Sequence, residues 1–305
     1  MIGYVLRRSI YTVLVMLGAA TVMFVTVRLS GDPVALFVGD AATAEDVAKV
    51  RTAMGFDLPA WVQYKRYLEQ ISTGNLGTSF RYEQPVVVLL SKALIPTLIL
   101  TCAATALATF IGLVMGVVSG IWRNSLVDYL SMGLAVLGQC SPVFLTAILA
   151  VLLFAVKLRW LPTSGWGSVE AAILPIVTLT LYVVGRIARM VRSAMLDVLS
   201  KDYIRTARAK GLHPVAILYR HALKNAAIPV VTISGVTFAS LLGGVVVTET
   251  VFGIPGLGQL LVRAVLTRDF PLAQGAILVI AFMVTWANLL IDVTYVILDR
   301  RLAHD

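Results

Sequence analysis

The sequence predicts an all-α membrane protein with six transmembrane helices, and three observations support this prediction. Of the 305 residues, 59% are apolar and 13% are charged, and the mean hydropathy of +0.89 is too high for a soluble domain. Six apolar runs approach or exceed the roughly 20 residues that cross a bilayer as a helix. Lys and Arg are concentrated in alternate connecting segments, which is typical of a protein with several spans.

The first apolar run, residues 9–29, follows Arg7 and Arg8. The run is too long for the core of a signal peptide and no small-residue cleavage site follows it, so we expect a retained first span. Residues 30–92 are mostly polar and are expected outside the cytoplasm. Within this segment Thr43-x-x-Asp46 predicts the start of one helix, and a second helix is expected at about 61–71.

Five further runs are expected to cross the membrane: 95–121, 127–156, 171–191, 228–252 and 272–298. The first of these five is rich in Ala, Gly and Thr, which permit close approach of helices. The run 127–156 contains Ser141-Pro142, which predicts a kink within one continuous span. The chain therefore divides into a tail with the first span (1–29), an extracytoplasmic segment (30–92) and a membrane core (93–305).

The distribution of basic residues orients these spans. Twelve Lys or Arg residues fall on the side that holds both termini: Arg7, Arg8, Arg123, Arg192, Lys201, Arg205, Arg208, Lys210, Arg220, Lys224, Arg300 and Arg301. The short loops of the other side hold four: Lys157, Arg159, Arg263 and Arg268. Because basic residues favour the cytoplasmic side, this difference predicts that both termini are cytoplasmic.

A polar loop in the second half of the chain, 193–228, carries the strongest functional signal. Asp202 at the start and Lys210 at the end of one segment complement the dipole of a short helix. Gly211 is suited to end that helix in a left-handed conformation, and Pro214 is suited to begin another. A solvated loop that only follows the positive-inside rule would explain the charge, but it would not need a helix–Gly–Pro–helix unit. We therefore favour a helix that docks on a partner.

Motifs spread along the chain resemble the permeases of ABC importers, in their dipeptide and oligopeptide branch. The motifs include RTARAKGL at 205–212, HALKN at 221–225, ETVF at 249–252, PGLG at 255–258 and NLLID at 288–292. The long outer segment resembles that of the B-type member of the permease pair. The resemblance runs almost end to end and implies the type I importer permease fold, with six transmembrane helices and an outer segment between the first two.

The resemblance also implies partners. These are a second, homologous permease, two ABC ATPase subunits, an extracytoplasmic substrate-binding protein, a peptide substrate and the lipid of the cell membrane. The chain contains no phosphate-binding loop, so it is not expected to be an enzyme. No cofactor or metal is expected in this chain, and ATP and Mg²⁺ would be bound by the ATPases. Import of nickel or haem by a permease of the same branch is an alternative.

The resemblance assigns a coupling role to one set of residues in the polar loop. These residues, which are expected to contact an ATPase, are Asp202, Tyr203, Arg205, Thr206, Ala207, Arg208, Lys210, Gly211 and Leu212. Arg205 and Thr206 stand where the family's signature has Glu and Ala. A contact made by Glu is therefore not expected, whereas the helix and its terminal Gly211 are.

Further candidate residues lie near the outer side and within the spans. Trp61 and Tyr64 are expected to anchor the binding protein. Glu249 is expected either to contact an outer gate or to lie at the membrane interface. Charged residues within spans are costly and rare. Asp292 is interpreted as a structural partner of Arg186 or Arg189 rather than as a substrate contact.

Other classes of function fit the sequence less well. The net charge of +9 would suit nucleic acid, but the basic residues are not interleaved with aromatic residues, so membrane orientation explains them. A membrane enzyme would need clustered His, Asp or Cys, and the two cysteines, Cys102 and Cys140, lie in separate apolar runs. A channel or ion-coupled carrier would need a polar filter or paired intramembrane carboxylates, and only Asp292 and Glu249 are available.

Overall fold

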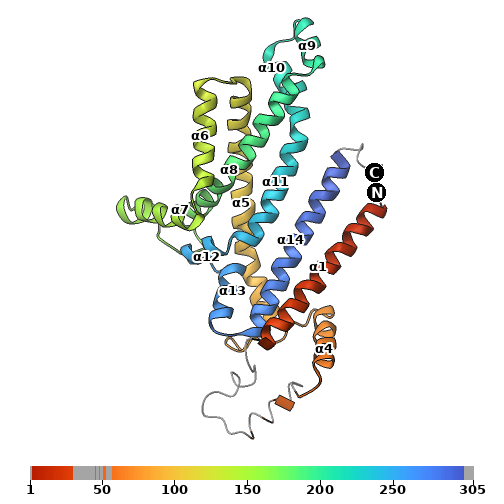
Figure 1. Ribbon diagram of the computed structural model, residues 1–305. Helices are drawn as coiled ribbons and strands as arrows, with labels where there is room; N and C mark the ends of the chain where they lie inside the picture. Colours follow the sequence, from red (N-terminus) through yellow and green to blue (C-terminus); the bar gives the residue numbers. More distant parts are fainter. Residues whose placement is uncertain (1, 30–44, 46–47, 49–50, 53–56, 299–305) are drawn as a thin grey trace.

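The computed structural model describes residues 2–29, 45, 48, 51–52 and 57–298. Within these ranges the chain is almost entirely helical, with one isolated bridge between Thr78 and Pro85. Figure 1 shows the long helices side by side, with α9 and α10 projecting from one end of the bundle and α4 at the other. The all-α fold predicted from the sequence is confirmed. The predicted helix start at Thr43 and Asp46 lies outside the described residues.

The helices follow one another along the chain as α1 (Ile2–Leu29), α4 (Ala60–Ser72), α5 (Val86–Ile121), α6 (Leu126–Cys140), α7 (Val143–Ala150), the π-helix η1 (Val151–Lys157), α8 (Val169–Leu199), α9 (Asp202–Ala209), α10 (Pro214–Ala216), the π-helix η2 (Ile217–Leu223), α11 (Lys224–Gly244), α12 (Val246–Phe252), α13 (Leu257–Leu266) and α14 (Phe270–Leu298). Four of them are long and apolar enough to cross a membrane: Arg7–Leu29, Val86–Ile121, Val169–Leu199 and Phe270–Thr294. Three bent pairs of helices pass the same test, so the described residues allow up to 7 spans and do not fix the count at six.

The predicted third span, 127–156, is sharply bent at the position where the sequence predicts a kink. Its two halves are bent by 100° at Ser141-Pro142, and Figure 1 shows α7 projecting sideways from the bundle. Ser141 has the extended backbone angles φ −81° and ψ 129°, which residues before proline favour. Pro142 lacks the N–H that would continue the helix, so α6 ends and a new helix begins in another direction.

The predicted fifth span, 228–252, is also interrupted. α11 ends at Gly244 and α12 begins at Val246. α12 ends at Gly253, which has a left-handed φ of +64°. The following helix, α13, is bent by 82° from α12. The two short helices therefore form a corner that packs against α7 and α14 rather than a continuation of α11.

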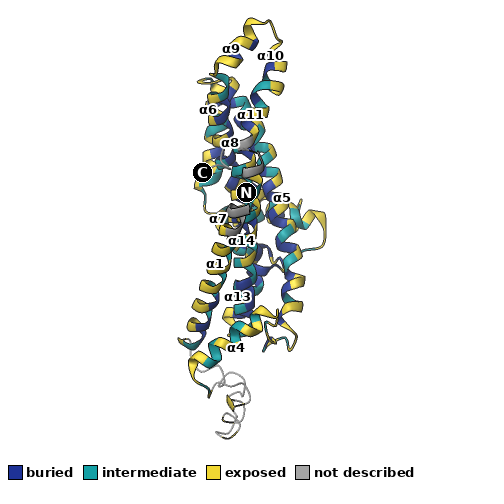
Figure 2. Cartoon of the chain, turned by 90° about the vertical axis from the view of Figure 1, so that its right-hand side faces the viewer, coloured by how far each residue is buried: buried dark blue, intermediate teal, exposed yellow. Residues whose placement is uncertain are grey.

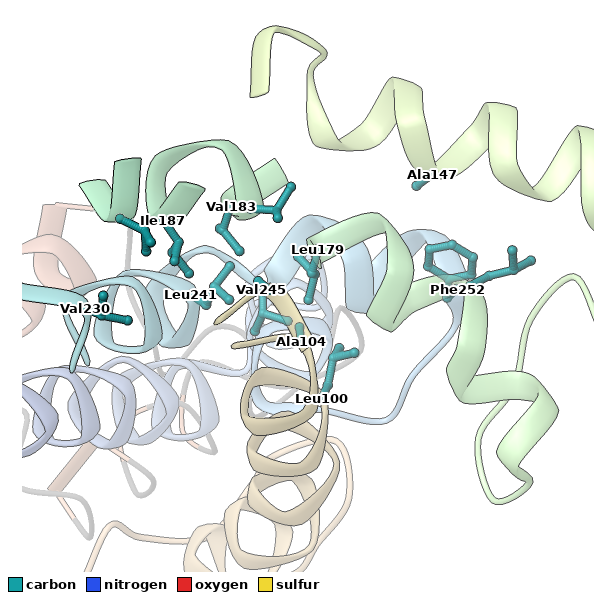
Figure 3. Close-up of a cluster of buried hydrophobic side chains, with 14 of the residues drawn as sticks. Leu100, Ala104, Ala147, Leu179, Val183, Ile187, Val230, Leu241, Val245 and Phe252 are labelled. Atoms are coloured by element: carbon teal, nitrogen blue, oxygen red, sulfur yellow. The ribbon is translucent and has the colours of Figure 1, made fainter. Parts of the chain in front are cut away.

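The centre of the bundle is the contact between α5 and α8, and it depends on glycine. A Cβ atom built on Gly112, Gly116 or Gly120 of α5 would lie 2.8, 2.5 or 2.7 Å from a side-chain atom of α8. Glycines spaced four residues apart share one face of a helix and let another helix approach closely. Figure 3 shows the adjoining apolar cluster, in which Leu100 and Ala104 of α5 lie among side chains of α8, α11 and α12.

Two other helices leave much of their surface uncovered. Figure 2 shows α1 largely exposed along one side, and α6 also carries exposed apolar residues such as Leu134 and Leu137. Because these residues are apolar and lie on candidate spans, their natural surroundings are lipid or another membrane subunit rather than water.

A buried aspartate ties the outer segment to the bundle. Asp269, between α13 and α14, is 1% exposed and accepts hydrogen bonds from the backbone N–H groups of Phe80, Arg81 and Leu272 at 3.2 to 3.3 Å, and from the hydroxyl of Ser79. These donors satisfy a carboxylate that would otherwise be costly to bury. The turn that precedes α5 is therefore held against the α13–α14 corner.

Candidate functional site

The predicted helix of the polar loop is present as α9, Asp202–Ala209. Gly211 follows it with φ +71°. The N–H of Leu212 donates to the carbonyl of Ala207 at 3.3 Å, and the N–H of Gly211 donates to the carbonyl of Arg208 at 2.9 Å. This pair of bonds is the Schellman motif that closes a helix on a left-handed residue. Pro214 occupies the first turn of α10, so both sequence predictions about how these helices end and begin are confirmed.

One face of α9 holds it to the rest of the chain. Ile204 is 0% and Ala207 is 6% exposed, and both pack against Ile217 of η2, with Val198 of α8 beside them. Burial of a side chain the size of isoleucine stabilises by about 2 kcal/mol. Ala207, which we assigned to the ATPase contact, therefore faces this chain's own interior.

The other face of α9 is polar and exposed. It carries Asp202, Tyr203, Arg205, Thr206, Arg208 and, just beyond its end, Lys210. The Arg205 guanidinium lies 3.1 Å from the Asp202 carboxylate, and an exposed pair of this kind contributes little to stability. The side-chain amide of Asn225 donates to the Tyr203 hydroxyl at 3.1 Å. The exposed charges are thus available to another molecule.

An apolar groove lies beside this polar face. Its volume is about 370 Å³, and its lining includes Leu199, Leu212, Pro214 and Leu218, with Arg208 among the lining residues. Leu212 is 43% exposed. A projecting helix with cationic residues beside an apolar depression combines the two features of a protein-docking surface, an apolar centre and a polar rim.

A bidentate ion pair supports the same end of the bundle. Both guanidinium nitrogens Nε and Nη2 of Arg192 on α8 contact the two carboxylate oxygens of Asp128 on α6, at 2.8 and 2.7 Å. Ser119 of α5 also donates to this carboxylate, and the N–H of Asn124 donates at 3.0 Å. Asp128 is 3% exposed, so the paired charges are largely removed from water and removal of either partner is costly.

Glu249 stabilises the α12–α13 corner through buried hydrogen bonds. Its side chain is 0% exposed, and it accepts hydrogen bonds from the Thr97 hydroxyl at 2.5 Å and from the backbone N–H of Gln259 at 3.0 Å. A Cβ atom on Gly256 would lie 2.1 Å from this carboxylate, so the loop can approach it only with glycine there. The alternative that Glu249 is a surface residue at the membrane interface is wrong because the side chain is buried.

The two predicted anchors on α4 differ in their surroundings. Trp61 is 71% exposed. Tyr64 packs against α1: its hydroxyl shares a 2.6 Å hydrogen bond with Thr21, and its ring lies 4.9 Å from that of Phe24. Tyr67 lies on the same side, where burial and the neighbouring Tyr64 raise the pKa of its phenol to about 12. Trp61 is therefore the one of the two predicted anchors that faces outward.

The predicted partner of Asp292 is wrong. Asp292 pairs with Arg8 of α1, because α14 packs against α1 and α11 rather than against α8. Arg189 instead donates from Nη2 to the side-chain oxygen of Gln139 at 2.5 Å. Arg186 is half-buried on α8 and forms no ion pair with the residues that the structure describes.

The sequence predicted no structural role for Asp128, Asp269 or Thr97, and it placed Arg192 only among the basic residues that orient the spans. Each of these residues contacts a partner on an element that is distant in the sequence, and no local sequence pattern predicts such a contact. Asp128 alone gave a weak signal, because it stands three residues after Ser125, which caps α6. Among the described residues, no group of three or more His, Cys, Asp or Glu is arranged to hold a metal ion.

The family model described as binding-protein-dependent transport system inner membrane component matches residues 108–304. A second model, for the N-terminal part of such membrane components, matches residues 1–101. The chain belongs to this family. It is therefore an integral membrane permease of an ABC importer and not an enzyme. Membership implies in general a partner permease, an ATPase and a binding protein.

Relatives and solved structures agree with this assignment. The chain is 39% identical to a probable peptide ABC transporter permease protein of Sinorhizobium fredii, with 99% of each chain covered. It is 41% identical to a glutathione transport system permease protein of Salmonella paratyphi A, with 100% of each covered. The methionine ABC transporter MetNI in inward-facing conformations has a similar fold, with a TM-score of 0.58 and 20% identity over 70% of this chain and 97% of that one.

Proposed function

We propose that this permease imports peptides, and that α9 is the helix through which it couples to an ATPase. In this proposal the chain lines half of a translocation path with a second permease, and two ATPases bind ATP and Mg²⁺. A binding protein delivers the peptide from outside. The chain itself holds no cofactor, and both of its termini are cytoplasmic. The Lys and Arg bias of the connecting segments supports this orientation.

The geometry of α9 is the observation that carries the coupling role. The helix projects beyond the bundle (Figure 1), yet Ile204 anchors it to α8 and η2 and the Schellman motif at Gly211 fixes how the chain leaves it. A displacement of α9 would therefore move α8, to which it is joined through only two residues. A solvated connector would need neither the buried anchor nor the closed helix end.

Peptide is the substrate class that the relatives favour. Their printed names include peptide and glutathione transport, and glutathione is itself a small peptide-like molecule. Uptake of a labelled dipeptide by cells with the complete complex, in competition with longer peptides, glutathione, haem and nickel, would identify the substrate. Competition by haem or nickel alone would overturn the peptide assignment.

The coupling role is tested by reversing one charge on the exposed face of α9. Arg208→Glu should lower co-purification of the ATPases and peptide uptake, because a mismatched charge at an interface costs several kcal/mol. The loss should be larger at low salt, where electrostatic contacts are screened less. Lys157→Glu is the matched control, since Lys157 is exposed but lies on η1, away from α9. Wild-type ATPase retention in Arg208→Glu at every salt concentration would contradict the coupling role.

The orientation is tested separately with tags. A tag at either terminus should be reached only from the cytoplasm, and a tag near Ala42 only from outside. Labelling of a C-terminal tag on intact cells would contradict the proposed orientation, whatever the result of the transport assay.

A further inference from the structure

A long apolar groove separates part of α1 from α14. Its volume is about 500 Å³, and its lining includes Thr12, Met16 and Ala20 on α1 and Leu278, Phe282 and Trp286 on α14. Leu68, Ile71 and Ser72, near the end of α4, complete the lining. Because α4 packs along the outer half of α1 through Tyr64, it covers the outer part of the groove. Figure 1 shows the three helices beside one another.

The dimensions of the groove match one hydrocarbon chain. Its lining on α1 runs from Ser9 to Ala20, on the order of 16 Å at the rise of an α-helix. This length is about half of the roughly 30 Å hydrocarbon core of a bilayer, which is the depth of one leaflet. A volume of about 500 Å³ over that length gives a cross-section of about 30 Å². A helix about 10 Å wide has a cross-section of roughly 80 Å², so a helix of another subunit would cover the groove without filling it.

Positive charge stands at the inner end of the groove. Ser9 and Leu289 line that end, and the residues beside them along the chain include Arg7, Arg8 and Asp292. Arg8 and Asp292 form an ion pair, and Arg7 is exposed, with its guanidinium 5.7 Å from the ring of Tyr11. The two arginines and one aspartate leave a net positive charge. Anionic headgroups of the cytoplasmic leaflet are attracted to such juxtamembrane cations.

We propose that this groove is a binding site for one anionic phospholipid of the cytoplasmic leaflet. One acyl chain lies between α1 and α14, and the phosphate contacts Arg7. The bound chain fills the space between two helices that otherwise meet incompletely, so the lipid stabilises the attachment of α1 to the core. The assignment to the cytoplasmic leaflet rests on the proposed orientation of the termini.

The test uses the assembled complex in nanodiscs that contain an anionic phospholipid with a photoreactive acyl chain. After illumination, mass spectrometry should find the label on the α1 segment 9–20 and the α14 segment 278–289. Thr12→Trp places a large ring in the groove and should lower this labelling about tenfold, the effect of weakening binding by 1.4 kcal/mol. Val15→Trp is the matched control, because Val15 is 52% exposed on α1 and does not line the groove.

Headgroup recognition is tested by removing one charge. Arg7→Gln should lower labelling by the anionic phospholipid about fivefold relative to a neutral phosphatidylcholine probe, since one juxtamembrane cation contributes about 1 kcal/mol. Arg7→Lys should keep the preference. Labelling with a neutral probe that already equals that of the anionic probe in the wild type would overturn the headgroup assignment.

Two outcomes would overturn the site itself. One is equal labelling of both faces of α1 that Thr12→Trp does not change. The other is efficient disulfide formation between Met16→Cys and a cysteine introduced in the second permease, which would show that a protein covers the groove. Neither measurement depends on transport or on ATPase binding. A failure of the coupling proposal and a failure of the lipid site therefore give different results.

Discussion

The left-handed residue at the end of α9 gives a graded test of how the chain couples to its ATPase. Gly211 has φ +71°, and a Cβ atom built there meets no heavy atom within 4 Å. A substitution therefore causes backbone strain but no collision. The strain of a left-handed conformation is about 1 kcal/mol for alanine and larger for a β-branched residue, while asparagine tolerates it.

These costs lower the population of molecules in which the chain leaves α9 in its native left-handed conformation at Gly211, here called the native corner. A cost of about 1 kcal/mol lowers the ratio of native to altered corner about fivefold, and about 2 kcal/mol lowers it about thirtyfold. If an ATPase binds only the native corner, its apparent affinity falls by up to the same factors. Because a strain of about 1–2 kcal/mol at one residue is small beside the burial that holds the spans together, the membrane bundle should remain folded. The expected order of activity is Gly211, then Gly211→Asn, Gly211→Ala and Gly211→Val.

The assay measures the ATPases that co-purify with the permease, together with peptide uptake, for each variant. Gly133→Ala is the control, because Gly133 lies within α6 and has no neighbouring atom within 4 Å of a built Cβ. Alanine is favoured over glycine inside a helix, so this variant should behave as wild type. If Gly211→Val retains its ATPases and transports at the wild-type rate, the corner is only a connector and the reasoning fails.

Three further predictions concern the buried ion pair of Asp128, the buried carboxylate of Glu249 and the two aromatic residues of α4. Asp128→Ala should lower the free energy of unfolding by about 3 kcal/mol because it leaves Arg192 without its buried partner. The double variant Asp128→Ala with Arg192→Met should recover most of this loss. If denaturation of the purified complex shows that the losses of the two single variants simply add, the ion pair does not have the predicted role. Glu249→Ala should destabilise the α12–α13 corner by about 1–3 kcal/mol for each donor left unsatisfied. Cysteines placed on α13 should then react faster with a thiol reagent. An unchanged reaction rate in Glu249→Ala would contradict the predicted destabilisation of the corner. Trp61→Ala should reduce stimulation by the binding protein while changing the free energy of unfolding by less than about 0.5 kcal/mol. Tyr64→Phe should lower the free energy of unfolding and leave stimulation by the binding protein unchanged, because Tyr64 contacts α1. Equal effects of Trp61→Ala and Tyr64→Phe in both assays would contradict this distinction.

The features that sequence predicted correctly are local ones. The end of α9 at Gly211 and the start of α10 at Pro214 depend on backbone preferences of single residues. Apolar length revealed the four continuous spans in the same way. Ser141-Pro142 predicted a kink, but apolar length could not predict its size of 100°, because a straight and a bent apolar segment have the same composition.

The features that sequence missed depend on tertiary contacts. The sequence suggested Arg186 or Arg189 of α8 as the partner of Asp292, yet α14 lies against α1 and the partner is Arg8. For Glu249 the sequence left two alternatives open, a contact at an outer gate and a residue at the membrane interface, because no neighbouring residue in the sequence indicates that the side chain is buried. Its partner Thr97 is more than 150 residues away in the chain. Pairings of this kind follow from which helices are neighbours, and apolar periodicity does not determine that order.

The packing of α5 against α8 explains how a displacement of α9 would reach the α12–α13 corner. At Gly112, Gly116 and Gly120 no room remains for even one added carbon. Tightly packed interiors move as units rather than deform gradually, so α5 would follow α8. The hydroxyl of Thr97, also on α5, donates to Glu249 at 2.5 Å and accepts from the N–H of Leu257 at 2.9 Å. The corner at α9 that is proposed to dock and the corner of α12 and α13 are therefore attached to the same pair of helices, which gives a displacement of α9 a continuous packed route to α12 and α13.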